Sequence, residues 1–476
     1  MRRASIHILA ILLLLSVCLA SCIARPEEKE ENEGETLTSE SFTPVVDEGE
    51  DGEAAKAYAE YKENLSLAFG ESERTDASSF KYETVDGGIT VTEFVGTESV
   101  VVIPESIEGM PLVRIEAGAF SGKGVRAVYI PDSVLSIEKG AFADCEGLST
   151  LRLPFVGDGG EIGYVGHIFG AEGYSQNALK LPSSLKYIIV GDSEERIEAN
   201  AFAGCKDIAA IALSDSVKEI GEFAFFECND LVCIELSGVE SVGQYAFGYC
   251  ESLYRISLAG VKSIGKGALA SCSSLYCVEL AFGESNRFLG YAFGADAADY
   301  NDEFVPESLR RVIVASGCTF IPDRAFAACK YLTEVDLPEG VTKIGVRAFY
   351  ACRSLVDIDL PFSVRTVGDD AFFGCDNLAS VTLADGLEGI GMQAFYGCSS
   401  LREISIPASV TEIRSSTFYG CKALERVELG GVNKIGKDAF AGCTSLTPPD
   451  TSMVIDVADG NDALFKSEMD TTEKAE

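Results

Sequence analysis

A repeat of 22 or 23 residues runs through most of this 476-residue chain and limits what the chain can fold into. Its most regular copy extends from Leu355 to Cys375, and the segment from Leu378 to Cys398 repeats the same pattern. An Ala-Phe pair marks nearly every copy, and its aromatic position falls at residues 120, 142, 169, 202, 225, 247, 269, 293, 326, 349, 372, 395, 418 and 440. One such unit cannot bury its own apolar face, but a stack of units can, so the repeat predicts a solenoid of about fourteen coils.

Two steps in this series are 33 residues long, from Phe169 to Phe202 and from Phe293 to Phe326. The sequences at the two sites are similar, with Gly-His-Ile-Phe-Gly-Ala at 166–171 and Gly-Tyr-Ala-Phe-Gly-Ala at 290–295. We infer that a block containing one enlarged coil was duplicated. Two anchors also depart from the pattern, because Leu replaces Phe at position 269 and Thr replaces Ala at position 417.

Each coil contains two strand-like patterns and one turn-like pattern. Leu-x-x-Ile-x-Leu predicts a half-buried strand, Val-x-x-Ile-Gly predicts a second strand on the opposite wall, and Ala-Phe-x-x-Cys suits a short helical turn. These patterns resemble leucine-rich repeats, specifically the BspA-like repeats of bacterial surface proteins, over about residues 80–446. The resemblance implies an α/β, mainly β, solenoid with a parallel sheet on its concave side. It also implies adhesion to host matrix proteins or to other bacteria.

The first 21 residues have the features of a lipoprotein signal peptide. Arg2 and Arg3 precede an apolar run too short to span a membrane, and Leu-Ala-Ser at 19–21 then leads into Cys22. The segment resembles the bacterial lipoprotein cleavage box, which implies that Cys22 is lipidated and attaches the mature chain to the membrane. The alternative is a plain secretory signal in which Cys22 is incidental.

Four further regions follow the signal. Residues 22–53 are rich in Glu and predict a disordered acidic tether, which is either an export signal to the outer surface or a solvated spacer. Residues 54–111 predict a short helix and an N-terminal hairpin cap. The helix is expected at 54–69, where Tyr58, Tyr61, Leu65 and Phe69 recur at near-helical spacing, and the hairpin turns at 86–88. Residues 112–446 form the repeat solenoid, and residues 447–476 form an acidic tail.

The charge of the chain restricts its partners. Lys and Arg total 38 against 75 Asp and Glu, a formal net charge of −37. Such a chain repels nucleic acid and anionic headgroups, so nucleic acid is excluded as a partner and membrane attachment depends on Cys22.

Eleven cysteines recur at one fixed position of the repeat, at residues 145, 205, 228, 250, 272, 329, 352, 375, 398, 421 and 443. An exported protein with many cysteines often has disulfides, but a single column of evenly spaced cysteines favours buried thiols that fill small apolar spaces. Cys233 and Cys277 differ, since both fall at outward strand positions, either as exposed thiols or within an apolar patch.

Little in the sequence suggests catalysis, and we predict no enzyme, catalytic residue, cofactor or metal site. His167 is the one histidine after the signal, and two segments that resemble phosphate-binding loops, at 260–267 and 431–437, lack the Ser or Thr that should follow the Lys. Acidic residues pair on two adjacent predicted strands, at 334 and 336 and at 357 and 359. They predict a solvated acidic face or, alternatively, a weak calcium site.

The predicted binding surface lies on the concave strands, where Tyr and Arg cluster in an otherwise acidic chain. Its residues are Tyr254, Arg255, Tyr276, Arg310 and Arg311. We expect a monomer on the outer surface of the bacterial cell envelope that binds a protein or glycan of a host or bacterial surface. Ordinary surface variation could also produce this cluster. The alternative function is a periplasm-facing envelope scaffold or assembly protein without a host ligand.

Overall fold

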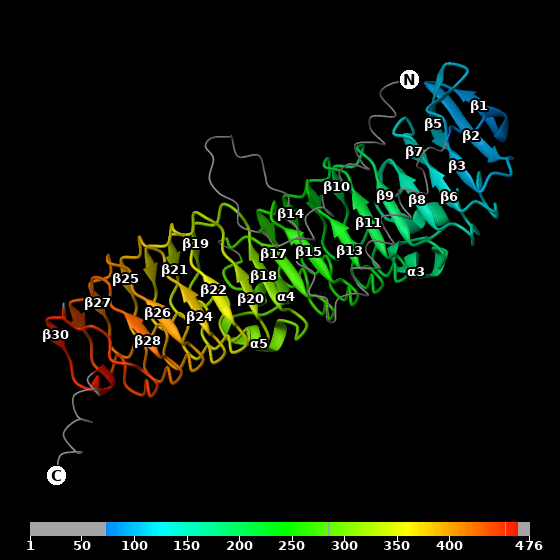
Figure 1. The fold of residues 1–476 in the computed structure, drawn as a ribbon. Helices are drawn as coiled ribbons and strands as arrows, with labels where there is room; N and C mark the ends of the chain where they lie inside the picture. Colours follow the sequence, from blue (N-terminus) through cyan, green and yellow to red (C-terminus); the bar gives the residue numbers. More distant parts are fainter. Residues whose placement is uncertain (1–72, 284–285, 453, 465–476) are drawn as a thin grey trace, which may run out of the picture. The chain divides into compact units, whose positions relative to one another are not determined.

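The computed structural model describes residues 73–283, 286–452 and 454–464, which form a parallel β-solenoid of about 16 turns with little helix (Figure 1). The prediction of a leucine-rich repeat solenoid is therefore confirmed. The predicted signal peptide with Cys22, the tether, the helix at 54–69 and the tail from 465 lie outside the described residues. No helix within the described ranges is long and apolar enough to cross a membrane.

The chain divides into two compact units, and each is described by itself. Unit 1 comprises the described residues up to Glu194 together with Asp207–Ser216 and Val232–Ile234. Its sheets and short helices are η1 (Ala77–Ser79), β1 (Phe80–Val85), β2 (Gly88–Phe94), β3 (Val100–Val102), β4 (Ser106–Ile107), β5 (Met110–Ile115), β6 (Ala127–Tyr129), β7 (Ser136–Ile137), β8 (Thr150–Leu153), η2 (Val165–Phe169), η3 (Tyr174–Gln176), α3 (Asn177–Lys180), β9 (Tyr187–Val190), β11 (Ala210–Leu213) and β13 (Cys233–Glu235). A six-stranded sheet runs in the order β13-β11-β9-β8-β6-β3.

The N-terminal hairpin forms where the sequence predicts it. Strands β1 and β2 pair antiparallel around Asp86 and Gly87, and Gly87 adopts the left-handed backbone that the tight turn requires (φ 93°). Strand β2 then pairs parallel with β5, so the hairpin continues the solenoid as well as capping it. Phe94 at the end of β2 stacks on Phe120 with ring centroids 5.3 Å apart, and it acts as a core anchor one turn before the first Ala-Phe pair.

Unit 2 comprises Glu195–Lys206, Val217–Leu231 and the described residues from Glu235 onward. Its longer strands, from the Leu-x-x-Ile-x-Leu pattern, are β15 (Arg255–Leu258), β17 (Cys277–Leu280), β18 (Arg311–Val314), β20 (Glu334–Asp336), β22 (Asp357–Asp359), β24 (Ser380–Thr382), β26 (Glu403–Ser405) and β28 (Arg426–Glu428). Its two-residue strands, each of which ends at an Ile or a Val, are β10 (Arg196–Ile197), β12 (Glu219–Ile220), β14 (Ser241–Val242), β16 (Ser263–Ile264), β19 (Phe320–Ile321), β21 (Lys343–Ile344), β23 (Thr366–Val367), β25 (Gly389–Ile390), β27 (Glu412–Ile413), β29 (Lys434–Ile435) and β30 (Asp456–Val457). Its short helices are α4 (Gly290–Phe293), η4 (Ala298–Tyr300), α5 (Asn301–Phe304) and η5 (Asp462–Leu464).

The Ala-Phe-x-x-Cys segments stack their aromatic rings through the core of unit 2. Phe349, Phe372 and Phe395 are fully buried, and successive ring centroids lie 5.0 and 5.2 Å apart in nearly parallel planes. The segment closes as a hydrogen-bonded turn in which the Cys375 amide donates to the Phe372 carbonyl at 3.2 Å. Close backbone packing also explains the Gly of Ile-Gly, because a Cβ on Gly391 would lie 2.4 Å from the amide nitrogen of Asp369 in the previous coil.

The cysteine column makes a regular hydrogen bond between coils. In nine of the eleven ladder positions the thiol donates to the backbone carbonyl of the core Phe one coil earlier, at 3.0–3.2 Å. The other two, Cys205 and Cys329, are buried and directly follow the enlarged coils. All fourteen cysteines of the described residues are free thiols, which agrees with the predicted reduced ladder.

The two enlarged coils have the same internal construction, as the inferred duplication predicts. In unit 1, η2, η3 and α3 follow one another, and in unit 2 α4, η4 and α5 do the same. A fully buried Asn begins each final helix, and its Oδ1 accepts a hydrogen bond from a backbone amide, Gly166 to Asn177 at 3.0 Å and Gly290 to Asn301 at 2.9 Å. These asparagines support the enlarged loops and were not identified from the repeat.

The C-terminal end contains one more turn than the predicted boundary at residue 446 allows. Strand β30 pairs parallel with β29, and the buried Asn461 accepts a hydrogen bond from the Phe440 amide at 3.1 Å. In the other column β28 is the edge strand of its sheet. Pro448 and Pro449 follow at the matching point of the next coil, and because proline has no N–H to donate, pairing stops there.

Candidate functional site

The predicted binding residues lie on the outward side of one four-stranded sheet in unit 2. We call the outward positions of β15, β17, β18 and β20, with the residue preceding each of the first three strands, the strand face of unit 2. Parallel register aligns Arg255 with Cys277 and Cys277 with Arg311, while the alternate residues Ile256, Val278 and Val312 are buried in the core. Alternation of side chains along each strand therefore separates the core from the candidate site.

Tyr254 and Tyr276 stack on one another at this face. Their ring centroids are 5.4 Å apart with an interplanar angle of 9°. The backbone fixes this arrangement, since the Tyr276 amide donates to the Tyr254 carbonyl at 2.8 Å and the Arg310 amide donates to the Tyr276 carbonyl at 3.0 Å. Tyr254, Tyr276 and Arg310 thus occupy successive positions of one column, as the repeat spacing predicts.

The second column differs from the expectation in its ion pairs. The Arg311 guanidinium bonds Asp336 at 2.7 and 2.8 Å and lies 3.5 Å from Glu334, on the adjacent strand. Burial disfavours the charge of Arg311, but the two carboxylates outweigh burial and raise its pKa. We predicted separate basic and acidic zones at this face. At Arg311 they are instead one internal ion-paired group, because strand spacing brings the acids of β20 within reach of β18.

Cys277 lies between Arg255 and Arg311 in the same column. Its side chain is buried, and this burial raises the pKa of its thiol to about 11 despite the two nearby guanidinium groups. The thiol therefore belongs to the packed surface of the face and is a poor nucleophile at neutral pH.

Arg310 lies against an aromatic residue that the sequence analysis missed. Its guanidinium carbon lies 5.9 Å from the ring centroid of Tyr331, and its Nη1 donates to the Glu307 carbonyl. The Tyr331 hydroxyl donates to the Glu307 carboxylate at 2.8 Å, and this bond raises the pKa of Tyr331. Tyr331 lies two residues before the position aligned with Arg310. Strand alignment alone therefore does not predict the contact, which depends on how far the Arg310 side chain extends.

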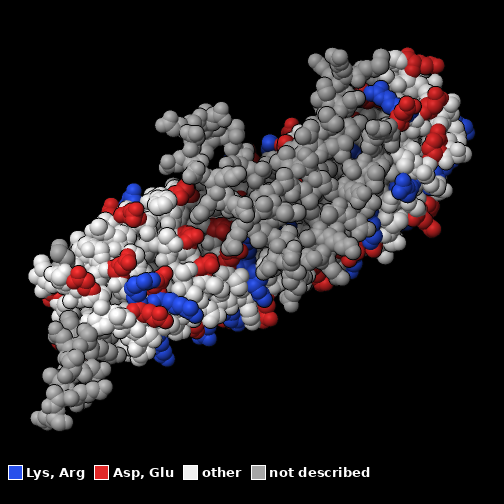
Figure 2. Space-filling model, viewed as in Figure 1, with Lys and Arg blue, Asp and Glu red and all other residues white. Residues whose placement is uncertain are grey.

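The acidic residues predicted on β20 and β22 are present but are not alike. Glu334 and Asp336 are half-buried and engaged by Arg311, whereas Asp357 and Asp359 are exposed. Within the residues that the structure describes, no group of three or more His, Cys, Asp or Glu side chains could hold a metal ion. Figure 2 shows acidic and basic side chains lying among uncharged ones on the visible side of the C-terminal strands.

His167 lies in unit 1 within η2 and is buried. Burial lowers the pKa of its imidazole, and its ring contacts Tyr164 edge-on at 6.0 Å. Its carbonyl accepts hydrogen bonds from the amides of Gly140 and Gly170, so the residue has a structural position in the enlarged coil.

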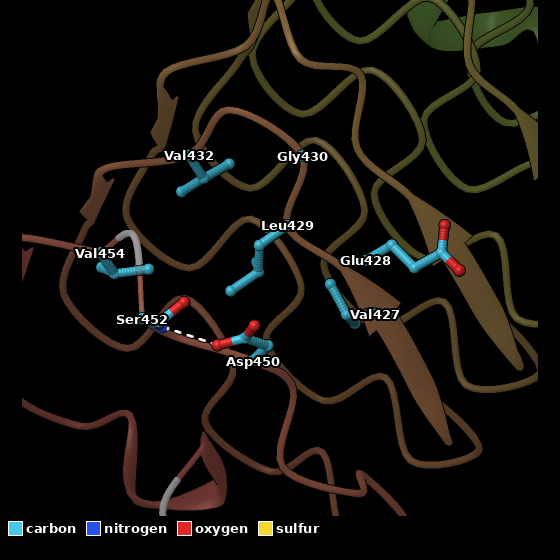
Figure 3. Close-up of a pocket in the computed structure, with 8 residues that line it drawn as sticks. All are labelled: Val427, Glu428, Leu429, Gly430, Val432, Asp450, Ser452 and Val454. Carbon is cyan, nitrogen blue, oxygen red and sulfur yellow. Dashed lines mark hydrogen bonds between the residues drawn. The ribbon is translucent and has the colours of Figure 1, made fainter.

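A small pocket of about 270 Å³ lies beside the last long strand of unit 2 (Figure 3). It is lined by Val427, Glu428, Leu429, Gly430, Val432, Asp450, Ser452 and Val454. The Asp450 carboxylate accepts a hydrogen bond from the Ser452 amide at 2.8 Å, which uses its oxygen within the turn that follows the two prolines. We interpret this pocket as a structural space at the end of the column of long strands, beside β28.

Comparison with known proteins adds a family match. A family model described as the BspA type leucine rich repeat region matches the chain in six copies, over residues 111–156, 174–296 and 302–448. No curated protein matches the chain. The matched ranges include every residue of the strand face of unit 2.

Several solved bacterial structures are similar to the chain. A leucine-rich repeat protein of Bacteroides ovatus is 22% identical, covering 71% of this chain and 95% of its own, with a TM-score of 0.33. A leucine rich cell surface protein of Faecalibacterium prausnitzii is 22% identical and covers 83% and 97%, with a TM-score of 0.30. The pneumococcal vaccine antigen PcpA is 20% identical and covers 83% and 96%, with a TM-score of 0.26.

Proposed function

Because the chain belongs to the BspA-type leucine-rich repeat proteins, we propose that it is a lipid-anchored surface protein without enzymatic activity that binds a macromolecule through the strand face of unit 2. The observation that carries this proposal is the stacked pair Tyr254 and Tyr276, held by backbone hydrogen bonds between neighbouring coils. A rigid aromatic surface loses little conformational freedom on binding, and tyrosine supplies apolar area with a polar tip.

The neighbouring charges favour a ligand that can contact aromatic and cationic groups together. Arg310 and Arg255 flank the tyrosines, while Arg311 is compensated by Asp336 and Glu334. We therefore assign ligand contact to Tyr254, Tyr276, Arg255 and Arg310, and give Arg311 the role of ordering the adjacent strand. A protein or glycan of a host or bacterial surface has the required mixture of polar and apolar groups, which makes adhesion the proposed role.

The binding test uses the soluble chain from residue 23 to capture ligands from matrix proteins and from the organism's own envelope extract. We expect the double change Tyr254→Ala with Tyr276→Ala to weaken binding of the captured ligand by about 2 kcal/mol or more. Lys343→Ala with Lys434→Ala, on the two-residue strands β21 and β29, is the control and should leave binding unchanged. If the lysine pair weakens binding and the tyrosine pair does not, the assignment to the strand face is wrong.

Anchoring is tested separately, through Cys22. The Cys22→Ala variant should lose acylation and move from the membrane fraction to the soluble fraction. Unchanged partitioning into the detergent phase would disprove the anchor.

Protease added to whole cells then distinguishes an adhesin from the alternative, an envelope scaffold that faces the periplasm. An adhesin on the outer surface is degraded on intact cells, whereas a periplasmic scaffold is protected until the cells are broken.

A further inference from the structure

The enlarged coil of unit 2 exposes two aromatic side chains. They belong to residues 296–304, which we call the lobe of unit 2, and Figure 1 shows α5 of this lobe on the flank of the long strands. Tyr300 directly precedes α5 and is 47% exposed, and Phe304 ends α5 and is 43% exposed. The two residues are four apart, a spacing that places side chains on one side of a helix. Large apolar side chains that lie together at a surface mark a site of contact with another molecule.

The lobe is fixed to the coils on both sides of it. Its buried Asn301 bonds backbone groups of its own coil and of the following coil, both at 2.9 Å. Asp296 pairs with Lys266 of the preceding coil. Asp299 accepts hydrogen bonds from the Arg324 guanidinium of the following coil at 2.9 and 3.1 Å. A surface held in this way loses little conformational freedom when a partner binds.

Negative charge surrounds the two rings. Residues 290–309 contain five acidic residues and no Lys or Arg. Two of the acids form the ion pairs to the neighbouring coils. Asp302 and Glu303 lie between Tyr300 and Phe304 in the sequence, are exposed and take no part in those ion pairs. The aromatic pair is therefore accompanied by carboxylates that face solvent.

The matching coil of unit 1 shows that an enlarged coil does not require this surface. Its Gly166 and Asn177 make the same buried hydrogen bond as the corresponding pair of unit 2. The outer positions differ, because residues 300 and 302–304 are Tyr, Asp, Glu and Phe, whereas the matching residues 176 and 178–180 are Gln, Ala, Leu and Lys. The unit 1 coil, at 166–185, contains one acid and one lysine. The two coils thus share an interior, and the aromatic and acidic residues of the lobe serve something other than the fold.

We propose that the lobe of unit 2 is a docking site for a positively charged protein surface that contains an apolar groove. The groove receives the rings of Tyr300 and Phe304, and Lys or Arg side chains at its rim pair with Asp302 and Glu303. The formal net charge of −37 attracts such a partner and repels a second copy of this chain. The inference does not depend on ligand binding at the strand face of unit 2.

The probe for this site is a fluorescein-labelled helical peptide of leucine and lysine with one apolar and one cationic side. Its fluorescence anisotropy measures binding to the full chain. We expect Tyr300→Ser with Phe304→Ser to weaken binding by about tenfold or more, because the apolar contact is lost. The matched control is Tyr174→Ser with Leu179→Ser, which removes two exposed apolar side chains from the unit 1 coil and should leave the affinity unchanged. Unchanged binding by the first variant, or equal weakening in both, would overturn the proposal.

A second pair of changes tests the charge of the lobe. Asp302→Asn with Glu303→Gln should weaken binding of the peptide several-fold at low salt and make it less dependent on salt concentration. Asp357→Asn with Asp359→Asn, at exposed positions of β22, removes the same charge elsewhere and should have a smaller effect. Equal effects would show that the peptide responds only to the net charge of the chain, which contradicts the proposal. Far-UV circular dichroism and the unfolding transition verify that every variant is folded.

Analytical ultracentrifugation of the full chain without the peptide tests a second copy as the alternative occupant of the lobe. We expect a monomer over the whole concentration range, because two such acidic chains repel one another. Self-association that Tyr300→Ser with Phe304→Ser abolishes would assign the lobe to a second copy of the chain and would overturn the proposal of a cationic partner.

Discussion

The Cys375 thiol donates a hydrogen bond to the Phe349 carbonyl, one coil earlier, at 3.1 Å. The same carbonyl also accepts a hydrogen bond from the amide of Cys352 at 3.1 Å, which closes the turn of its own coil. Each of the nine ladder cysteines that make this bond therefore links two coils through an oxygen that already has a backbone donor. The thiol contributes to stability, but it is not the only hydrogen-bond donor to the buried carbonyl. Removing the thiol therefore leaves no buried carbonyl without a donor.

We expect Cys375→Ala to lower the free energy of unfolding by only about 1 kcal/mol, because the Phe349 carbonyl keeps its amide donor and the cavity is small. Phe372→Ala in the same coil removes a ring stacked on both Phe349 and Phe395 and should cost about 3–5 kcal/mol. Urea unfolding of both variants measures the difference. An equal loss of unfolding free energy in the two variants would contradict the minor contribution that we assign to the Cys375 thiol.

The buried thiols predict a loss of stability at alkaline pH. Burial raises the pKa of Cys145 to about 11 and of Cys272 to about 12, and that of eight more ladder thiols above the ordinary value of 9.0. Below pH 9 the thiols are protonated in both states, and their contribution is fully present. Between pH 9 and the raised folded-state values only the unfolded chain ionises, so each thiol removes up to about 1.4 kcal/mol per pH unit.

The comparison with Cys375→Ala isolates this effect from tyrosine and lysine titration. The variant should show a shallower decline of unfolding free energy between pH 9 and 11, by about one proton. Chemical denaturation at a series of pH values measures both slopes. Identical slopes would show that Cys375 ionises equally in the folded and unfolded states.

Gly391 and Gly389 provide a matched pair two residues apart in one coil. A Cβ on Gly391 would lie 2.4 Å from the backbone of the previous coil, whereas one on Gly389 meets nothing within 4 Å. Gly391→Ala should therefore destabilise the protein by about 3 kcal/mol, and Gly389→Ala should be neutral or stabilise it by about 0.5 kcal/mol. Thermal unfolding distinguishes them, and a tolerated alanine at 391 would contradict the close contact between coils.

Asn301 should be essential to the enlarged coil of unit 2. Its Oδ1 accepts the Gly290 amide and its Nδ2 donates to the Ala327 carbonyl, both at 2.9 Å. Asn301→Ala leaves these groups without partners and should cost about 1–3 kcal/mol for each group left unsatisfied. Asn377→Ala, at an exposed position, is the control. Equal unfolding midpoints for the two variants would remove Asn301 from this role.

The repeat made the core of this protein predictable, since Ile358, Phe372 and Cys375 face the same surroundings in every coil. The relative positions of Tyr254, Tyr276 and Arg310 followed from the same spacing. The ion pair of Arg311 with Asp336 could not be read in this way, because it depends on side-chain reach between two strands. Repeat spacing determines which residues align from coil to coil, but it does not determine which side-chain groups contact one another.

Residues that occur once per irregular element escaped the pattern for a different reason. Asn177 and Asn301 are absent from the regular coils, so no column revealed them. Each lies eleven residues after the glycine whose amide it binds, and comparison of the two enlarged coils with each other would have found them. The final turn was missed because β30 follows a segment without the Leu-x-x-Ile-x-Leu pattern.

Pro448 and Pro449 carry a consequence for assembly. A stack of parallel strands presents, at its last strand, the same unpaired backbone that its own next coil would use, and another molecule could continue the stack end to end. The two prolines occupy the place of that next strand without offering amide hydrogens. The prolines thus end this column of strands at β28. They should also oppose end-to-end stacking of a second molecule on the β28 edge, the step with which a fibre would begin.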